Sequence, residues 1–138
     1  MINPCPTIVI AGSFDPLRYE DILLIKKANN YGHVYIILWN DASILKIQGT
    51  VLLIAKERQA ILKSITEVQG VIISTNTEKL NIAEELSWFS KPHSGTLYPP
   101  TYYGIPHNVK DIDPMEEEVC KKRNIKIIDN LIDDIDYV

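Results

Sequence analysis

Short apolar, β-branched runs alternate with longer amphipathic stretches along this chain. The short runs predict strands at Thr7–Ala11, His33–Trp39, Gln69–Ser74 and Ile125–Ile128. The longer stretches predict helices at Asp21–Asn30, Leu53–Ser64, Thr77–Phe89 and Met115–Arg123. Because strands alternate with helices, the pattern predicts a parallel sheet with right-handed crossovers. We therefore expect a Rossmann-like three-layer α/β/α fold, built as a single domain over residues 1–138.

The apolar positions also predict which face of a helix is buried. In Leu53–Ser64 the pattern places Ile54, Ile61 and Leu62 near the buried face and Arg58 on the opposite, exposed face. The helix at Met115–Arg123 begins with acidic and ends with basic residues, which suits the helix dipole, and Pro114 stands just inside its expected start.

One long segment, at about residues 90–113, lacks a clear period and is rich in proline and tyrosine. It predicts an irregular loop of the kind that is usually functional or mobile. Its tyrosines, Tyr98, Tyr102 and Tyr103, are typical of a protein contact surface. Its two histidines, His93 and His107, have no evident third metal ligand, so a polar loop or interface is favoured over a metal site. The acidic segment Asp129–Val138 is interpreted as a solvated end.

Composition excludes several classes of protein. A net charge of −4 and a pI near 5.3 argue against a general nucleic-acid binder, which needs a basic face. No apolar stretch approaches the ~18 residues of a membrane span, and the first residues do not resemble a secretory signal. Cys5 and Cys120 are too few for a disulfide framework and are interpreted as packing residues. We expect a cytoplasmic protein.

The segment between the first strand and the first helix carries the candidate chemistry. A strand, a tight Gly12–Ser13 turn and a helix start commonly present backbone N–H groups and a positive helix end to a phosphate. Here the helix entrance carries Glu20 and Asp21, which would repel a phosphate. The Asn40–Asp41 turn closes the second strand, and both turns lie at the carboxyl ends of strands, where such sheets bind ligands.

Residues 12–21, Gly-Ser-Phe-Asp-Pro-Leu-Arg-Tyr-Glu-Asp, resemble the G-x-F-D-x-x-H-x-G-H motif of the cytidylyltransferase-like nucleotidyltransferases. Residues 33–43 are similar to that family's second strand and N-x-D type turn, and Glu57–Arg58 to its E-R helix. Residues 114–128 resemble its late helix and strand more loosely. In that family the two histidines bind and polarise the triphosphate of CTP or ATP, often with Mg²⁺, while a sugar or polyol phosphate attacks the α-phosphate.

The resemblance assigns expected roles to residues of this chain. It implies a homodimer, with Mg²⁺ needed if the protein is active and no metal-binding residues of its own. The nucleotide-binding positions that it implies are Gly12, Ser13, Phe14, Asp15, Asp41 and Arg58. The catalytic positions that it implies are Arg18, Asp21 and Lys46.

The chain departs from the family where the chemistry is done. Arg18 and Asp21 stand at the histidine positions and Glu20 at the glycine. An ionised carboxylate only accepts hydrogen bonds and cannot replace a histidine donor. Each close contact of a carboxylate with a phosphate charge costs about 4 kcal/mol at an effective dielectric constant near 20. The leading hypothesis is therefore a catalytically inactive nucleotidyltransferase fold that binds a partner or a phosphorylated ligand.

Other interpretations stay open at this point. A divergent active enzyme would use Arg18, Lys46 and Arg58 as its positive charges and transfer CMP or AMP to a sugar or polyol phosphate. A flavodoxin-like or receiver-like module is the weakest hypothesis. For single residues the alternatives are structural: Arg18 pairing with Glu20 or Asp21, Asp15 bonding local backbone, Lys46 solvated, and Arg58 in a surface ion pair or a pair to the sheet end.

Overall fold

A five-stranded parallel sheet organises the chain. The computed structural model describes residues 6–75, 83–89 and 100–132. The sheet has the order β3-β2-β1-β4-β5, and every pair of neighbouring strands is parallel. The strands are β1 (Thr7–Gly12), β2 (His33–Leu38), β3 (Val68–Ile73), β4 (Tyr102–Gly104) and β5 (Lys126–Ile128). This arrangement confirms the predicted Rossmann-like α/β fold.

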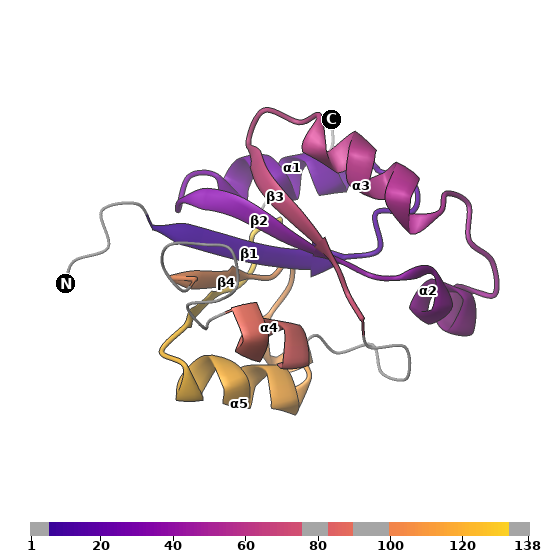
Figure 1. Ribbon diagram of the computed structural model, residues 1–138. Helices are drawn as coiled ribbons and strands as arrows, with labels where there is room; N and C mark the ends of the chain where they lie inside the picture. The colour runs from indigo at the N-terminus through magenta and orange to yellow at the C-terminus, as the bar shows by residue number, and fades with distance from the viewer. Residues whose placement is uncertain (1–5, 76–82, 90–99, 133–138) are drawn as a thin grey trace.

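The helices complete three layers. They are α1 (Tyr19–Ala28), α2 (Asp41–Gln48), α3 (Ala55–Lys63), α4 (Ala83–Phe89) and α5 (Pro114–Lys122), with a 3₁₀ turn at Val109–Asp111. Figure 1 shows α1 and α3 on one face of the sheet and α4 and α5 on the other. Helix α2 lies beyond the carboxyl ends of the strands. Among the residues that the structure describes, none of the helices combines the length and the apolar character needed to cross a membrane.

Both faces of the sheet are buried, which explains why the strands read as continuous apolar runs. Along β1, Ile8 and Ile10 belong to the core beneath α1 and α3, while Val9 belongs to the core beneath α4 and α5. All three side chains are fully buried. Cys120 on α5 is buried in the second core, which confirms its interpretation as a packing residue.

The predicted buried face of α3 is confirmed for Leu62 and wrong for Ile54, Ile61 and Arg58. Ala55, Arg58 and Leu62 point inward, whereas Ile54 and Ile61 are 52% and 40% exposed. A hydrophobic pattern assigns a charged side chain to solvent. Arg58 is buried because three carbonyl groups accept hydrogen bonds from its guanidinium and offset the cost of removing it from water. The predicted start of α5 is confirmed, since Pro114 is its first residue and Asp113 accepts a hydrogen bond from the Met115 N–H.

Two elements are missing from the sequence-based prediction. Strand β4 lies within the segment predicted to be irregular, yet it pairs with both β1 and β5. The contact-surface interpretation is wrong for Tyr103, which is 5% exposed and donates a 2.6 Å hydrogen bond to Glu116. Helix α2 begins where a turn alone was expected, because the Asn40 side chain caps it by accepting from the Ser43 N–H at 2.8 Å.

The beginning of the acidic C-terminal segment is part of the fold. The backbone N–H of Leu131 donates to Ile105 and that of Ile132 to Pro106. The Leu131 side chain is 4% exposed and joins the core beneath α1. The interpretation as a solvated end is therefore wrong for residues 129–132. The expectations for Cys5, His93, Tyr98 and the predicted helical residues 77–82 lie outside the described residues.

The packing of Leu131 on β4 generates a stability prediction. A Cβ atom on Gly104 would stand 2.8 Å from Leu131 Cδ1 and 3.0 Å from Ile8 Cδ1. We expect Gly104→Ala to lower the free energy of unfolding by about 1–3 kcal/mol. The double variant with Leu131→Ala should lose at least about 0.5 kcal/mol less free energy of unfolding than the two single variants lose together. Combined with Leu86→Ala in the core on the opposite face of the sheet, the costs in free energy should add. Urea unfolding of the variants measures both; additivity with Leu131→Ala would contradict the packing.

Candidate functional site

A cavity of about 500 Å³ opens at the carboxyl edge of the sheet. It lies between the ends of β1 and β4, where the chain order of the strands reverses. Open α/β sheets bind ligands at this topological switch point. The lining residues come from the turn after β1 (residues 11–16), the start of α1 (Arg18, Glu20, Asp21, Leu24), the segment after β2 (Trp39, Gln48) and the segments after β4 and β5 (Pro106, His107, Ile132).

The turn after β1 has a conformation that its sequence explains. Phe14 adopts a φ of 46°, in the left-handed region that few non-glycine residues occupy. This turn folds the Phe14 ring back so that a Cβ on Gly12 would stand 3.1 Å from it. Gly12 therefore makes room for the ring, which is 5% exposed. The tight turn predicted from Gly12–Ser13 is present and forms one wall of the cavity.

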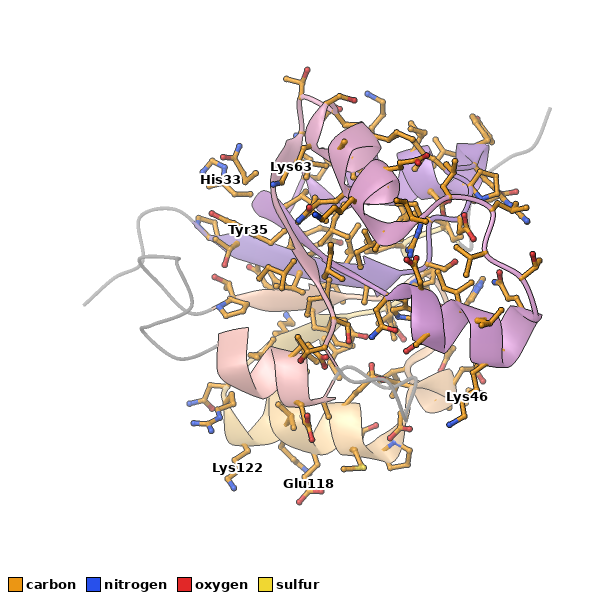
Figure 2. The ribbon with its side chains drawn as sticks, turned by 45° about the vertical axis from the view of Figure 1, so that its right-hand side comes forward. His33, Tyr35, Lys46, Lys63, Glu118 and Lys122 are labelled. Carbon is orange, nitrogen blue, oxygen red and sulfur yellow. The ribbon has the colours of Figure 1, made fainter. Side chains whose placement is uncertain are left out.

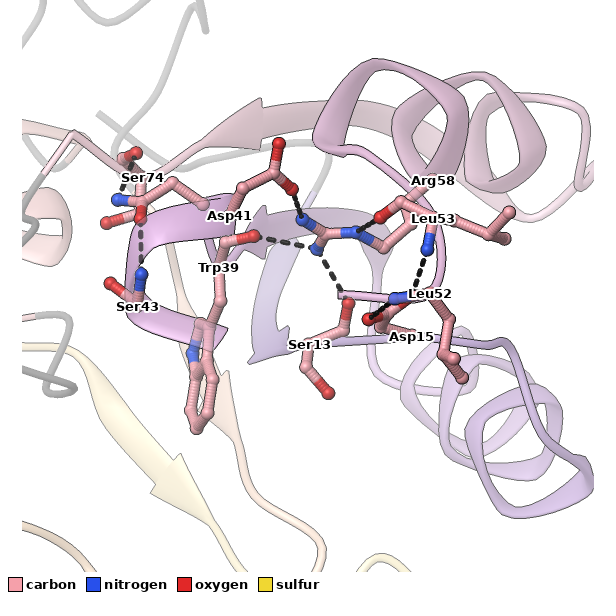
Figure 3. Close-up of polar contacts among 10 residues, drawn as sticks. Ser13, Asp15, Trp39, Asp41, Ser43, Leu52, Leu53, Arg58 and Ser74 are labelled. Carbon is pink, nitrogen blue, oxygen red and sulfur yellow. Dashed lines mark hydrogen bonds and ion pairs between the residues drawn. The ribbon is translucent and has the colours of Figure 1, made fainter. Parts of the chain in front are cut away.

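Asp15 holds the loop that precedes α3. Its two carboxylate oxygens accept hydrogen bonds from the backbone N–H groups of Leu52, at 2.9 Å, and Leu53, at 2.7 Å (Figure 3). The residue is 6% exposed. A bond to local backbone was one interpretation of Asp15; the structure shows bonds to backbone far along the chain instead. Asp15 lines the cavity, but its oxygens are already engaged in shaping the loops.

Arg58 joins the loops at the carboxyl edge. Its side chain is fully buried and donates hydrogen bonds to the carbonyl oxygens of Leu53 (2.8 Å), Ser13 (2.8 Å) and Trp39 (2.7 Å). It also forms a 2.6 Å ion pair with Asp41 (Figure 3). Of the alternatives for Arg58, the structural pair to the sheet end is the one observed. The side chain has no exposed surface through which to contact a nucleotide.

Asp21 closes the beginning of α1. Its carboxylate accepts a 2.9 Å hydrogen bond from the backbone N–H of Arg18, which is the residue that precedes the helix. Burial raises the pKa of the Asp21 carboxyl; the bond from Arg18 opposes this and the charge of Glu20 adds to it. The carboxylate thus takes the N–H of the residue before the helix and places a negative charge at the helix N-terminus, where an anion would otherwise be favoured.

Arg18 and Glu20 bring two opposite charges to the cavity wall. Arg18 is exposed and Glu20 is half-buried. Within the described residues, neither side chain forms an ion pair, with the other or with Asp21. Arg18 precedes the helix on an extended backbone, whereas Glu20 belongs to the first turn.

The predicted catalytic residues are only partly brought together. Arg18 and Asp21 line the cavity, whereas Lys46 is outside its lining and projects outward from the exposed side of α2 (Figure 2). Asp41 begins α2 and faces Arg58 rather than the cavity. Among the predicted nucleotide-binding residues, Gly12, Ser13, Phe14 and Asp15 line the cavity.

The sequence-based prediction missed His107 as a site residue. It reaches the cavity directly after β4, and because β4 was not predicted, its carboxyl end could not be identified as a ligand-binding edge. Trp39, at the end of a predicted strand, lines the cavity as well, and its indole N–H is buried without a hydrogen-bond partner in the described part of the chain. Residues 6–75, 83–89 and 100–132 contain no cluster of three His, Cys, Asp or Glu residues suited to a metal ion.

Comparison with known proteins supports the fold. No model of a known protein family and no curated protein sequence matches this chain. Among solved structures, the chain is similar to the lipopolysaccharide core biosynthesis protein from Thermoplasma volcanium GSS1, with a TM-score of 0.64 and 17% sequence identity. The likeness covers 91% of this chain and 95% of the other. At this identity it shows a shared Rossmann-like α/β fold over almost the whole length of both proteins.

The role of Arg58 generates a prediction about stability. Arg58→Met leaves three partly buried carbonyl groups without their donor and Asp41 without its partner, so we expect the free energy of unfolding to fall by about 3 kcal/mol. Asp41→Asn should cost less, about 1–3 kcal/mol, because it removes the charge that compensates buried Arg58 but keeps an oxygen that can accept its hydrogen bond. Lys63→Met, on the exposed side of α3, is the matched control and should change little. Equal costs for Arg58→Met and Lys63→Met in urea unfolding would contradict the assignment.

The burial of Asp21 generates a prediction about pH. Because its pKa is raised in the folded state, the folded state holds this proton more tightly than the unfolded chain does. This group therefore lowers stability progressively as pH rises from the ordinary carboxyl pKa of 3.8 through the higher folded pKa. We expect the melting temperature of Asp21→Asn, relative to that of the unsubstituted protein, to rise over this pH window. A constant or falling difference would show that burial does not control Asp21.

Proposed function

We propose that this chain is a nucleotidyltransferase-fold protein that binds a small ligand in the switch-point cavity and does not transfer nucleotidyl groups. One observation carries the proposal: the Asp21 carboxylate accepts the Arg18 N–H at the cavity wall, at a position where the resemblance places a phosphate-binding histidine. The solved structure that shares the fold belongs to a protein of lipopolysaccharide core biosynthesis, so the same scaffold serves a biosynthetic role elsewhere.

Electrostatics support the absence of transfer. The N-terminus of a helix carries roughly half a positive charge, and a phosphate would ordinarily benefit from it. Two carboxylates in the first turn of α1, those of Glu20 and Asp21, offset this charge. At an effective dielectric constant near 20, each carboxylate within ~4 Å of a phosphate charge costs about 4 kcal/mol. About 1.4 kcal/mol of barrier height is a factor of ten in rate, so repulsion of this size would slow transfer by several hundredfold or more. The guanidinium of Arg18, the arginine in the cavity lining, is exposed and does not offset two carboxylates.

A divergent active enzyme remains the second candidate, and His107 favours it. Arg58 is buried and Lys46 is outside the lining, so such an enzyme would have to hold its nucleotide with Arg18 and His107. His107 comes to the same cavity as Arg18 from another element, and a histidine there could supply the proton donor that the α1 motif lacks.

A transfer assay distinguishes the two candidates. We expect no release of pyrophosphate from CTP or ATP with Mg²⁺ and sugar or polyol phosphates, and no rise in melting temperature at millimolar nucleotide. The triple variant R18H/E20G/D21H restores the donors and removes both carboxylates, so it should gain nucleotide stabilisation, about 2.7 kcal/mol at 100 times the dissociation constant. The variant K46Q is the control and should gain none.

Turnover by the unsubstituted protein would overturn the proposal. If that turnover disappeared in H107A but persisted in K46Q, it would establish the second candidate. Circular dichroism of the triple variant checks that α1 still forms without its Asp21 cap.

A further inference from the structure

The two opposite charges on the cavity wall point to a particular class of ligand. We propose that the cavity binds a zwitterion, a small molecule that carries one carboxylate and one ammonium group on an apolar body. This inference rests on the proposed function, because it names the ligand of the same cavity. It assigns the carboxylate of the ligand to Arg18 and the ammonium to Glu20.

The first step is that neither charge has an ion-pair partner in the described part of the chain, although the Arg18 charge acts on the nearby Asp21 carboxyl. Within the described residues, Arg18 and Glu20 form no ion pair with each other or with another residue, and no side-chain hydrogen bond. Arg18 precedes α1 on an extended backbone and Glu20 belongs to the first turn, and the two side chains do not pair with each other. A half-buried carboxylate and a guanidinium in one concave site therefore both have unused capacity for a partner.

The second step compares ligand charges. An anion would meet the Arg18 guanidinium but also the carboxylates of Glu20 and Asp21. A cation would meet those carboxylates but leave the guanidinium beside it without a partner. Only a ligand with both charges satisfies both side chains, and the planar guanidinium suits a carboxylate in particular. The same wall therefore discriminates against both singly charged classes.

The third step concerns the body of the ligand. The remaining walls are mixed. Their apolar part includes Phe14, Leu24, Trp39, Pro106 and Ile132, and their polar part includes Ser13, Gln48 and His107. A volume of about 500 Å³ lies within the usual range of small-molecule sites. The cavity therefore has room for a hydrocarbon chain or ring between or beside the two charged groups.

The test uses matched probes that differ only in charge. The zwitterions are β-alanine, γ-aminobutyrate and ε-aminocaproate; each is paired with the carboxylic acid and the primary amine of the same chain length. Thermal melts and titration calorimetry are run on the full chain. We expect at least one zwitterion to bind about tenfold more tightly than both of its singly charged analogues, which corresponds to about 1.4 kcal/mol.

Two variants separate the two charges. In R18Q the preferred zwitterion should bind no better than its amine, and in E20Q no better than its acid. Lys56→Gln and Glu57→Gln, on the exposed part of α3, make the same charge changes away from the cavity and should leave all affinities unchanged. The melting temperature of each variant without probe shows that it is folded.

Each result has a distinct meaning. Binding of all three zwitterions no tighter than that of their analogues, or no binding by any of them, overturns this inference. Stabilisation of the unsubstituted protein by CTP or ATP with Mg²⁺, measured in the same melts, instead contradicts the proposed function. A zwitterion preference that survives in both R18Q and E20Q also overturns the inference, because the preference would then come from another surface.

Discussion

The guanidinium of Arg58 holds together the edge of the sheet on which the candidate site is built. A buried charge costs several kcal/mol unless hydrogen bonds and an opposite charge satisfy it. Arg58 meets this requirement with the carbonyl groups of Ser13, Trp39 and Leu53 and with the carboxylate of Asp41. These groups lie after β1, after β2 and before α3, so a single side chain determines how three separate segments meet.

Asp15 complements Arg58 from the other side of the same loop. Arg58 takes the Leu53 carbonyl group, while Asp15 takes the N–H groups of Leu52 and Leu53. Both the N–H groups and a carbonyl group of the loop before α3 are therefore hydrogen-bonded to side chains. This preorganisation gives the turn at Gly12–Asp15 a rigid backing, and it keeps the first turn of α1 at the mouth of the cavity. The contacts that shape this edge thus do not involve the Arg18 and Glu20 side chains.

That independence explains how the site departs from the family that it resembles. The residues that shape the turn, Gly12, Phe14 and Asp15, have packing and hydrogen-bonding roles in this structure. Asp21 stands where the resembled motif has a phosphate-binding histidine, and in this structure it caps a helix instead. Function depends on the chemistry of a site rather than on the fold that carries it. The shared fold is therefore compatible with a cavity whose charges suit a ligand other than a nucleotide.

The sequence by itself determined the long elements, because β1, β2, β3, α1 and α5 have the periodicity of buried strands and amphipathic helices. It also indicated the turn after β1 and the conflict between that turn and Glu20 and Asp21. The segments predicted at Ile125–Ile128 and Leu53–Ser64 also match β5 and α3. Tertiary structure alone decided strand β4 and the burial of Arg58. Strand β4 is three residues long and has no period of its own; pairing with β1 and β5 makes it a strand and brings His107 to the cavity. Arg58 is polar in any local pattern, and only carbonyl groups from distant segments make its burial favourable. A local sequence pattern reports the secondary structure that one segment favours. A site at the end of a parallel sheet depends instead on which segments the crossover connections place next to one another.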